Sequence, residues 1–159
     1  MTFRKAEKAD LPQVGALYTA AIGTEGCTWN RDYPGEMELQ GDFAAGCLYV
    51  LTEGAEIIGA ASVIPENELD GLDCWEVTDG GQREIARVVI AAGYRGRGLA
   101  EHMLRQLFAL LEAGGCSAVR LAVACGNGAA MRTYEKLDFA FLREHEMYGN
   151  CYWLCEKKF

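Results

Sequence analysis

Residues 88–107 read VVIAAGYRGRGLAEHMLRQL, and within them an apolar, strand-like run gives way to an amphipathic helical pattern. The junction holds three glycines and two arginines: Gly93, Arg95, Gly96, Arg97 and Gly98. Glycine loses more conformational freedom on folding than any other residue, so this many glycines in one junction require a compensating gain. The sequence therefore indicates either a tight turn or a bound ligand at this point.

Glycines between a strand and a helix commonly expose backbone N–H groups to an anion at the positive end of the helix. Two phosphate-binding motifs do not fit here. A P-loop requires Lys and Ser or Thr after its last glycine, where this chain has Leu99 and Ala100. A dinucleotide motif requires a third glycine where Glu101 stands, and a carboxylate would repel a pyrophosphate. A nucleotide-phosphate binder is therefore disfavoured.

The segments around the junction alternate irregularly between strand and helix patterns, and no linker or repeat divides them. We therefore expect a single domain over residues 1–159. Because the strands do not follow a regular βαβ rhythm, we expect a mixed sheet covered by helices, in the α/β (α+β) class. The predicted strands cover residues 2–6, 47–54, 56–64, 84–91, 118–124, 139–147 and 151–157, and the predicted helices cover 10–22, 36–45, 100–113 and 127–137.

Composition narrows the class of protein. The chain has 159 residues, half of them hydrophobic, and a net charge of −8. No apolar run approaches the roughly 20 residues of a membrane helix, and the first residues lack the apolar stretch of a signal peptide. We therefore expect a cytoplasmic protein with no membrane partner. Lys and Arg number only 15 and are scattered, so no nucleic-acid partner is expected.

Seven cysteines stand at irregular spacings, and no C-x-x-C pair occurs. An odd count without metal-ligand spacing is typical of free, buried cysteines in a reducing compartment. We therefore expect no metal. We also expect Cys151 and Cys155 to pack as free thiols from one face of a strand.

The pattern R-x-x-G-x-A, formed by Arg95, Gly98 and Ala100, resembles the pyrophosphate-binding signature Q/R-x-x-G-x-G/A of the GNAT superfamily of N-acetyltransferases. The pattern is short, and a plain strand–helix turn with exposed arginines would produce it as well. The opening segment TFRKAEKADLPQV also resembles the first strand and helix of that family.

A second match lies about thirty residues downstream, in NGAAMRTYEKLDF, residues 127–139. It is similar to the family's N-x-x-A-x-x-x-Y-x-x-x-G-F helix, and Asp138 replaces the usual glycine. Aspartate tolerates the left-handed backbone better than most residues, so the departure is mild. The residues in register are Asn127, Ala130, Tyr134 and Phe139.

The resemblance implies the GNAT fold, with a mixed central sheet of six to seven strands flanked by about four helices. It implies acetyl-CoA as co-substrate and direct transfer of its acetyl group to a primary amine in a ternary complex. The strand residues Val88, Val89 and Ile90 would line the pantetheine arm, which Asn127 would also contact. The N–H of Val88 would polarise the thioester carbonyl. The pyrophosphate would lie on backbone N–H groups of Arg95, Gly96, Arg97, Gly98, Leu99 and Ala100.

The resemblance also implies the proton transfers. Tyr134 would be the general acid that protonates the leaving thiolate, a role favoured by its register with Asn127, although its position on a helix also fits a core tyrosine. Glu84 would be the general base, although in some family members water carries the proton and a strand-end glutamate is often only solvated. Cys74 and Glu76 are weaker candidates for the base in the same region.

The acceptor site would be built from residues 23–36, 65–83 and 147–150. These segments combine carboxylates with four large aromatics, a composition that suits a cationic amine. The same aromatics would serve equally well as a cover for the core. The acceptor stays open among a small molecule, a peptide N-terminus and a lysine. A catalytically degenerate domain that binds acyl-CoA as a sensor is the alternative function, and a homodimer is possible. The four aromatics are Trp29, Tyr33, Trp75 and Tyr148.

Overall fold

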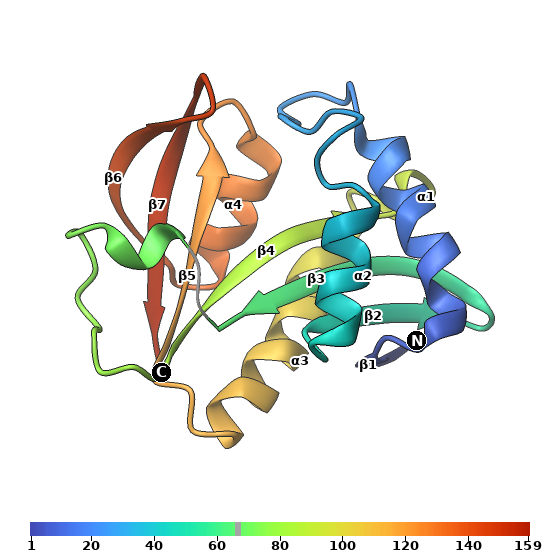
Figure 1. Cartoon of the computed structure of the whole chain (residues 1–159), viewed down its shortest axis with the longest axis horizontal. Coiled ribbons are helices and arrows are strands. Elements are labelled where there is room, and N and C mark those ends of the chain that lie inside the picture. The colour runs from blue at the N-terminus through green and yellow to red at the C-terminus, as the bar shows by residue number, and fades with distance from the viewer. Residues whose placement is uncertain (66–67) are drawn as a thin grey trace.

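One seven-stranded sheet with the order β1-β2-β3-β4-β5-β7-β6 organises the protein (Figure 1). The structure is a computed structural model that describes residues 1–65 and 68–159. Every neighbouring pair of strands is antiparallel except β4 and β5, which are parallel. The strands are β1 (Thr2–Lys5), β2 (Leu48–Glu53), β3 (Glu56–Ile64), β4 (Gln82–Ile90), β5 (Ala118–Ala124), β6 (Ala140–Met147) and β7 (Asn150–Lys158).

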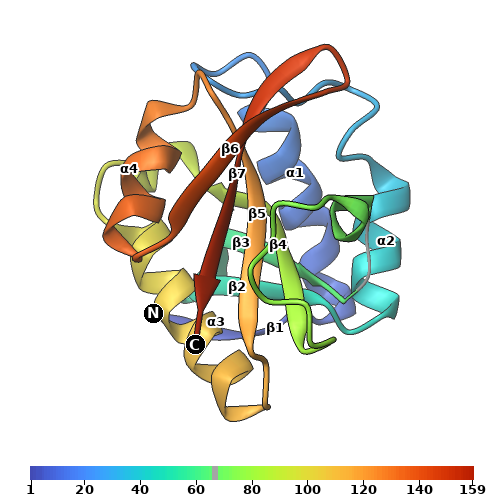
Figure 2. The ribbon, with the colours of Figure 1, turned by 90° about the vertical axis from the view of Figure 1, so that its left-hand side faces the viewer.

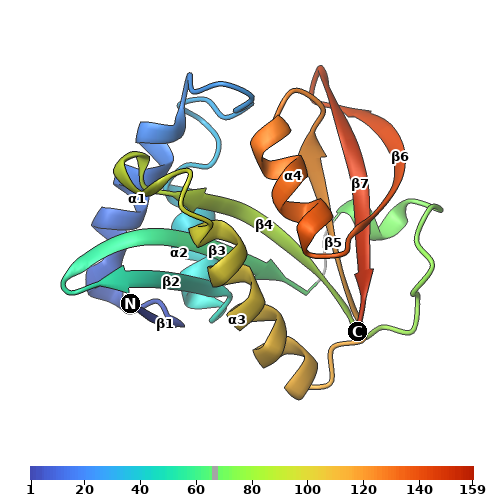
Figure 3. The ribbon, with the colours of Figure 1, turned by 180° about the vertical axis from the view of Figure 1, so that it is seen from behind.

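Helices cover both faces of this sheet. Figures 2 and 3 show α1 and α2 on one side and α3 and α4 on the other. Within residues 1–65 and 68–159, three short 3-10 helices, η1, η2 and η3, lie in the connections. The predicted mixed sheet with four α-helices is confirmed over the described residues. The helices are η1 (Lys8–Asp10), α1 (Leu11–Ala21), α2 (Glu36–Ala44), η2 (Glu68–Gly71), η3 (Ala92–Tyr94), α3 (Leu99–Ala113) and α4 (Gly128–Lys136).

Each helical layer covers one apolar core on its face of the sheet. Successive side chains of β3 point to opposite faces, so this strand contributes residues to both cores. Ile57 packs under α1 and α2, whereas its neighbour Ile58 packs under α3 and α4. Met103, Leu104 and Leu107 of α3 are fully buried in the second core, because they repeat at helical spacing on one face. Among the described residues, no helix is both long enough and apolar enough to cross a membrane.

The central strands β4 and β5 pair over only a short length. Their register runs from Gln82 opposite Ala118 to Glu84 opposite Arg120, and beyond Glu84 the two strands diverge (Figure 1). On its other edge β4 continues to pair with β3 as far as Ile90. Beyond Glu84, the backbone N–H and C=O groups on the edge of β4 that faces β5 are therefore not paired with β5.

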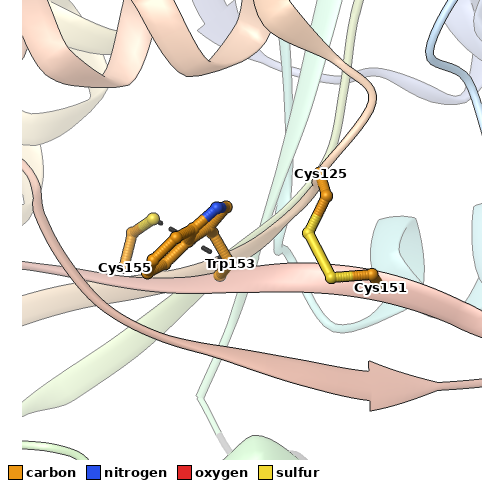
Figure 4. The surroundings of a disulfide bond; sticks show 4 residues. All are labelled: Cys125, Cys151, Trp153 and Cys155. Carbon is orange, nitrogen blue, oxygen red and sulfur yellow. Dashed lines mark hydrogen bonds between the residues drawn. A yellow bond between two sulfur atoms is a disulfide. The ribbon is translucent and has the colours of Figure 1, made fainter.

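One cysteine pair corrects the expectation of free thiols. Cys125, just beyond β5, and Cys151, in β7, form a disulfide with a Cα–Cα distance of 5.6 Å (Figure 4). The antiparallel register of β5 and β7 places them directly opposite each other, and sequence spacing carried no sign of that pairing. Cys155 is buried and free, and its thiol donates to the carbonyl of Trp153 at 3.7 Å.

Candidate active site

The divergence of β4 and β5 opens a cavity of about 520 Å³. Residues 85–90 of β4 form one wall and residues 121–124 of β5 form the other. The first turn of α3, the first two turns of α4 and the loop after α1 complete the lining. Because the strand edges inside the cavity are unpaired with each other, an extended ligand could use their N–H and C=O groups as a further strand would.

One end of this cavity is a backbone cradle at the N-terminus of α3. Gly98 is the N-cap residue of α3 with φ 72°, and Gly96 has φ 75°. A Cβ at either position would meet open space, so the left-handed backbone, rather than crowding, accounts for glycine here. The Nε of Arg95 donates to the carbonyl of Ile90 at 3.1 Å and anchors the loop to the end of β4. The free N–H groups of the first turn and the helix dipole favour an anion.

The residues predicted for the donor converge on the cavity with one exception. The guanidinium of Arg97 lies 5.1 Å from the ring centre of Tyr94 and is not part of the lining. The positive charge of Arg97 is therefore not directed into the cavity. The predicted residues that line the cavity are Val88, Val89, Ile90, Arg95, Gly96, Gly98, Leu99, Ala100 and Asn127.

Helix α4 brings two predicted residues to the middle of the cavity. Asn127 caps the helix, and its Oδ1 accepts from the N–H of Ala130 at 3.2 Å. Tyr134, two turns further on, is buried and lines the cavity, with its ring edge-on to Phe139 at 5.5 Å. Burial raises the pKa of Tyr134 well above its usual value, so the hydroxyl stays protonated and can donate a proton.

The loop after α1 closes the cavity above α4. Gly26 has φ 76°, and a Cβ there would lie 2.6 Å from the Cα of Asn127. Only glycine allows this close approach.

The same loop also carries Trp29, which was predicted for the acceptor. Trp29 lines the cavity, and its ring packs edge-on against Tyr18 with 5.5 Å between the ring centres. The Oγ1 of Thr28 lies 3.1 Å from the hydroxyl of Tyr152 of β7, which links this loop to the far half of the sheet.

Glu84 lies at the point where β4 and β5 separate, opposite Arg120 in the register. It is half-buried and is not part of the cavity lining. Burial raises its pKa to about 7, and Arg87 opposes the rise. A carboxyl with this pKa exchanges protons readily near neutral pH, as a general base must. Nearby carboxylates also raise the pKa: Glu68, Asp70 and Asp42.

Of the other predicted acceptor aromatics, Tyr33 lies close enough to Glu84 to feel its charge, whereas Tyr148 and Trp75 have other partners. The Tyr33 hydroxyl accepts from Arg87 at 2.9 Å, and Tyr148 is 76% exposed and donates to Glu68. Trp75 is instead buried, with its Nε1 donating to the carbonyl of Leu69 at 2.7 Å. Its ring lies under the guanidinium of Arg120, 4.4 Å from the ring centre. Trp75 therefore holds the segment before β4 onto the sheet rather than facing an acceptor.

The two weaker candidates for the base are placed differently. Glu76 forms a surface ion pair with Lys158 at 2.5 Å. Burial raises the pKa of the Cys74 thiol, which disfavours the thiolate. Like Glu84, neither residue lines the cavity. Glu84 has a pKa of about 7, which suits proton transfer at neutral pH.

Arg87 is a residue that sequence reasoning missed. In the register, Val89 faces Ala60 and Ala86 faces Ser62, so Arg87 and Val88 together stand opposite one residue of β3. This β-bulge puts Arg87 at φ 52°, which costs a non-glycine residue roughly 1–2 kcal/mol. The bulge arises from the pairing of β3 with β4, and no residue type in the stretch signals it.

Comparison with known proteins agrees with this geometry. The sequence profile of the Acetyltransferase (GNAT) family matches residues 15–139. The chain belongs to the GNAT family of acetyltransferases. A curated relative in sequence is the mycothiol acetyltransferase of Corynebacterium glutamicum, 38% identical over 66 residues, which are 42% of this chain. The match spans only 23% of that longer protein.

Solved structures of GNAT proteins share the whole fold. A GNAT-family acetyltransferase from Streptococcus agalactiae matches with a TM-score of 0.83 and 20% identity, over 99% of this chain and 94% of its own. The ribosomal-protein-alanine N-acetyltransferase of Brucella melitensis matches with a TM-score of 0.78 and 20% identity over the full length of both chains. The yncA protein of Salmonella typhimurium, solved with its cofactor acetyl-CoA, matches with a TM-score of 0.74 and 21% identity, over 99% of this chain and 93% of its own.

Proposed function

We propose that the protein transfers the acetyl group of acetyl-CoA to a primary amine by direct attack in a ternary complex. The observation that carries the proposal is the cavity between β4 and β5, which runs from the α3 cradle past Tyr134. The unpaired strand edges along this cavity could form hydrogen bonds with an extended pantetheine arm, and the N-terminus of α3 could hold a pyrophosphate. Acetyl-CoA is bound to the GNAT neighbour from Salmonella typhimurium.

The chemistry begins with the acceptor. A protonated amine is not a nucleophile, so Glu84 takes its proton, directly or through a water. The neutral nitrogen attacks the thioester carbon, and the carbonyl oxygen gains negative charge. Backbone N–H of Val88 at the bulge stabilises that charge. The intermediate collapses as the C–S bond breaks and the new C–N bond remains. Tyr134 protonates the departing thiolate, and the nitrogen releases its second proton to water, which leaves a neutral amide; Tyr134 then regains a proton from solvent.

The surroundings of Glu84 favour a cationic acceptor. Glu68 and Asp70 lie near enough to raise its pKa, while the hydroxyl of Tyr33 contacts Arg87 and that of Tyr148 contacts Glu68. Carboxylates and aromatic faces both attract an ammonium group. The classes to be compared are small amines, peptides with a free N-terminus and peptides with an internal lysine.

Two measurements test the proposal. Acetyl-CoA should raise the melting temperature, whereas ATP and NAD should not, because their motifs are lacking. Thiol release from acetyl-CoA should then depend on an added primary amine, with the N-acetylated form of each amine as its matched control. Absence of a melting shift with acetyl-CoA would overturn the proposal. Binding without thiol release for every amine class would indicate an acyl-CoA sensor instead.

A further inference from the structure

The bulge of β4 is held by a side-chain clamp that reaches α2. Arg87 makes two parallel hydrogen bonds to Asp42, from Nε and from Nη2, each of 2.8 Å. The Arg87 side chain is 11% exposed and that of Asp42 is 9% exposed. Two-point pairing of this kind fixes direction as well as distance, and lysine cannot reproduce it.

Two further elements join the same clamp. The Oγ of Ser62, in β3, donates to Asp42 at 2.6 Å, and Ser62 stands opposite Ala86 beside the bulge. The remaining guanidinium nitrogen of Arg87, Nη1, donates to the hydroxyl of Tyr33 in the loop before α2. Strand β3, strand β4, helix α2 and this loop therefore meet at one buried charge pair.

The strained backbone and the clamp coincide at one residue. Arg87 carries the left-handed φ, lines the cavity and forms the ion pair. Strain of this kind persists only where the surrounding structure over-determines it, and it is concentrated at functional sites. The next residue, Val88, belongs to the cavity wall.

We propose that Arg87 is a positioning residue for acetyl transfer, because its ion pair with Asp42 holds the bulge in the conformation that presents the backbone of Val88 to the thioester. The inference rests on the proposed function. It adds to that function a residue that touches neither the donor's reacting atoms nor the amine. Asp42, on α2, is the other residue of this ion pair and is needed for the same positioning.

Arg87 also has a second, electrostatic effect that provides an independent signature. Its positive charge lowers the pKa of Glu84, whereas the charge of Asp42 raises it. The other groups around Glu84 keep their chemical identity in variants of the clamp, although Tyr33 loses its hydrogen bond from Arg87 when that side chain is removed. They are Glu68 and Asp70 from η2, Tyr33 from the loop before α2, and Arg120 opposite it on β5.

Three substitutions separate the effects. Arg87→Gly removes the clamp and the charge but leaves the positive φ accessible without strain. Arg87→Lys keeps the charge and loses the two-point geometry. Asp42→Asn keeps the shape of the partner and removes its charge. Arg4→Lys is the matched control, since Arg4 forms a similar two-point pair with Asp10, at 2.6 and 3.1 Å, away from the cavity.

We expect all three clamp variants to lose roughly tenfold or more in kcat, because a small displacement of a polarising N–H is costly. Acetyl-CoA affinity should stay near that of the unsubstituted protein, since the α3 cradle is untouched. The acid limb of the kcat/KM profile should move to higher pH in Arg87→Gly, stay in place in Arg87→Lys and move to lower pH in Asp42→Asn. Arg4→Lys should retain both kcat and the profile.

The inference is overturned if Arg87→Gly and Arg87→Lys turn over at the unsubstituted rate. It is equally overturned if their loss of kcat equals the fraction unfolded at the assay temperature, measured by thermal melting. Hydrogen exchange at the amides of residues 85–91 tests the clamp without turnover. Faster exchange in Arg87→Gly than in Arg4→Lys supports the clamp, and equal exchange contradicts it. Failure of the proposed function has a different signature, in which the unsubstituted protein releases no thiol.

Discussion

Glu84 and Tyr134 are kept in different protonation states by the same physical cause. Burial raises the pKa of each group, because a buried site disfavours the charged form. For the carboxyl this places the pKa at about 7, so both forms are populated at neutral pH. For the phenol it leaves only the protonated form. A base that can accept a proton and an acid that still holds one therefore coexist at pH 7.

Replacing Glu84 by Gln should lower kcat/KM by about 10²–10⁴-fold and abolish the acid limb near pH 7. It should also stabilise the fold in alkaline solution. Because the pKa in the folded state lies above the ordinary value of 4.5, protonation favours the folded state, and this stabilisation is lost as the pH rises from about 4.5 to about 7. We expect a gain of about 1–3 kcal/mol at pH 8 that fades towards pH 4.5. Urea unfolding at pH 8 and pH 5 measures it, and equal stability at pH 8 would contradict the burial argument.

Replacing Tyr134 by Phe should slow turnover while leaving acetyl-CoA binding nearly unchanged, because the ring and its contact with Phe139 are retained. Steady-state kinetics and a binding titration separate the two quantities. Tyr49→Phe is the matched control, since that ring stacks on Phe3 outside the cavity lining. If Tyr134→Phe turned over normally, Tyr134 would be a core residue and not the acid.

At the scale of elements, the start of α3 depends on backbone conformation more than on side chains. Gly96 and Gly98 adopt positive φ with open space around them, whereas Gly93, in η3, does not have a positive φ. The three glycines of the junction therefore differ in what they contribute. Two of them form the turn that presents N–H groups, and the third is replaceable.

Gly98→Ala should lower the free energy of unfolding by about 1 kcal/mol, because alanine is strained at positive φ. It should also weaken acetyl-CoA binding, since relaxation of the strain shifts the first turn of α3. Gly93→Ala should be neutral on both counts, as a Cβ there meets nothing within 4 Å. Chemical unfolding and a binding titration are the measurements. Equal effects of the two substitutions would show that the conformation of Gly98 does not matter.

Periodicity and motif spacing were sufficient to predict the strands, the α-helices and the glycine turn before α3. Alternation and helical repeats depend only on neighbours in the chain, so they are visible without the fold. The bulge at Arg87 and the burial of Trp75 beneath Arg120 depend on which strands pair and on what packs over them. The raised pKa of Glu84 has the same origin, because its main cause is burial and the three carboxylates that add to it come from η2 and α2.

At the scale of the whole molecule, two halves of the sheet meet through three register pairs between β4 and β5. The half formed by β5, β6 and β7 carries its own covalent link, between Cys125 and Cys151. The closed segment contains α4 with Asn127 and Tyr134. The link therefore restrains the unfolded chain around the part that supplies the predicted acid.

Removing this link should destabilise the protein by about 3 kcal/mol, given a sequence separation of 26 residues. Dithiothreitol should lower the unfolding midpoint of the unsubstituted protein and leave a Cys125→Ser, Cys151→Ser double variant unaffected. Thiol titration of the unreduced, denatured protein should count five thiols rather than seven, since five cysteines are free. A count of seven would contradict the disulfide.

The cavity between β4 and β5 has an evolutionary consequence. Backbone groups are common to all residues, so a donor site built from strand edges and a helix terminus survives most substitutions in its walls. The structural neighbours share only 18–22% of their residues with this chain yet keep its fold. Under the proposed function, substitutions around the donor would be tolerated, and the loops near Tyr33, Glu68 and Tyr148 would diversify independently. A lineage with this architecture can change its acceptor without rebuilding its donor site.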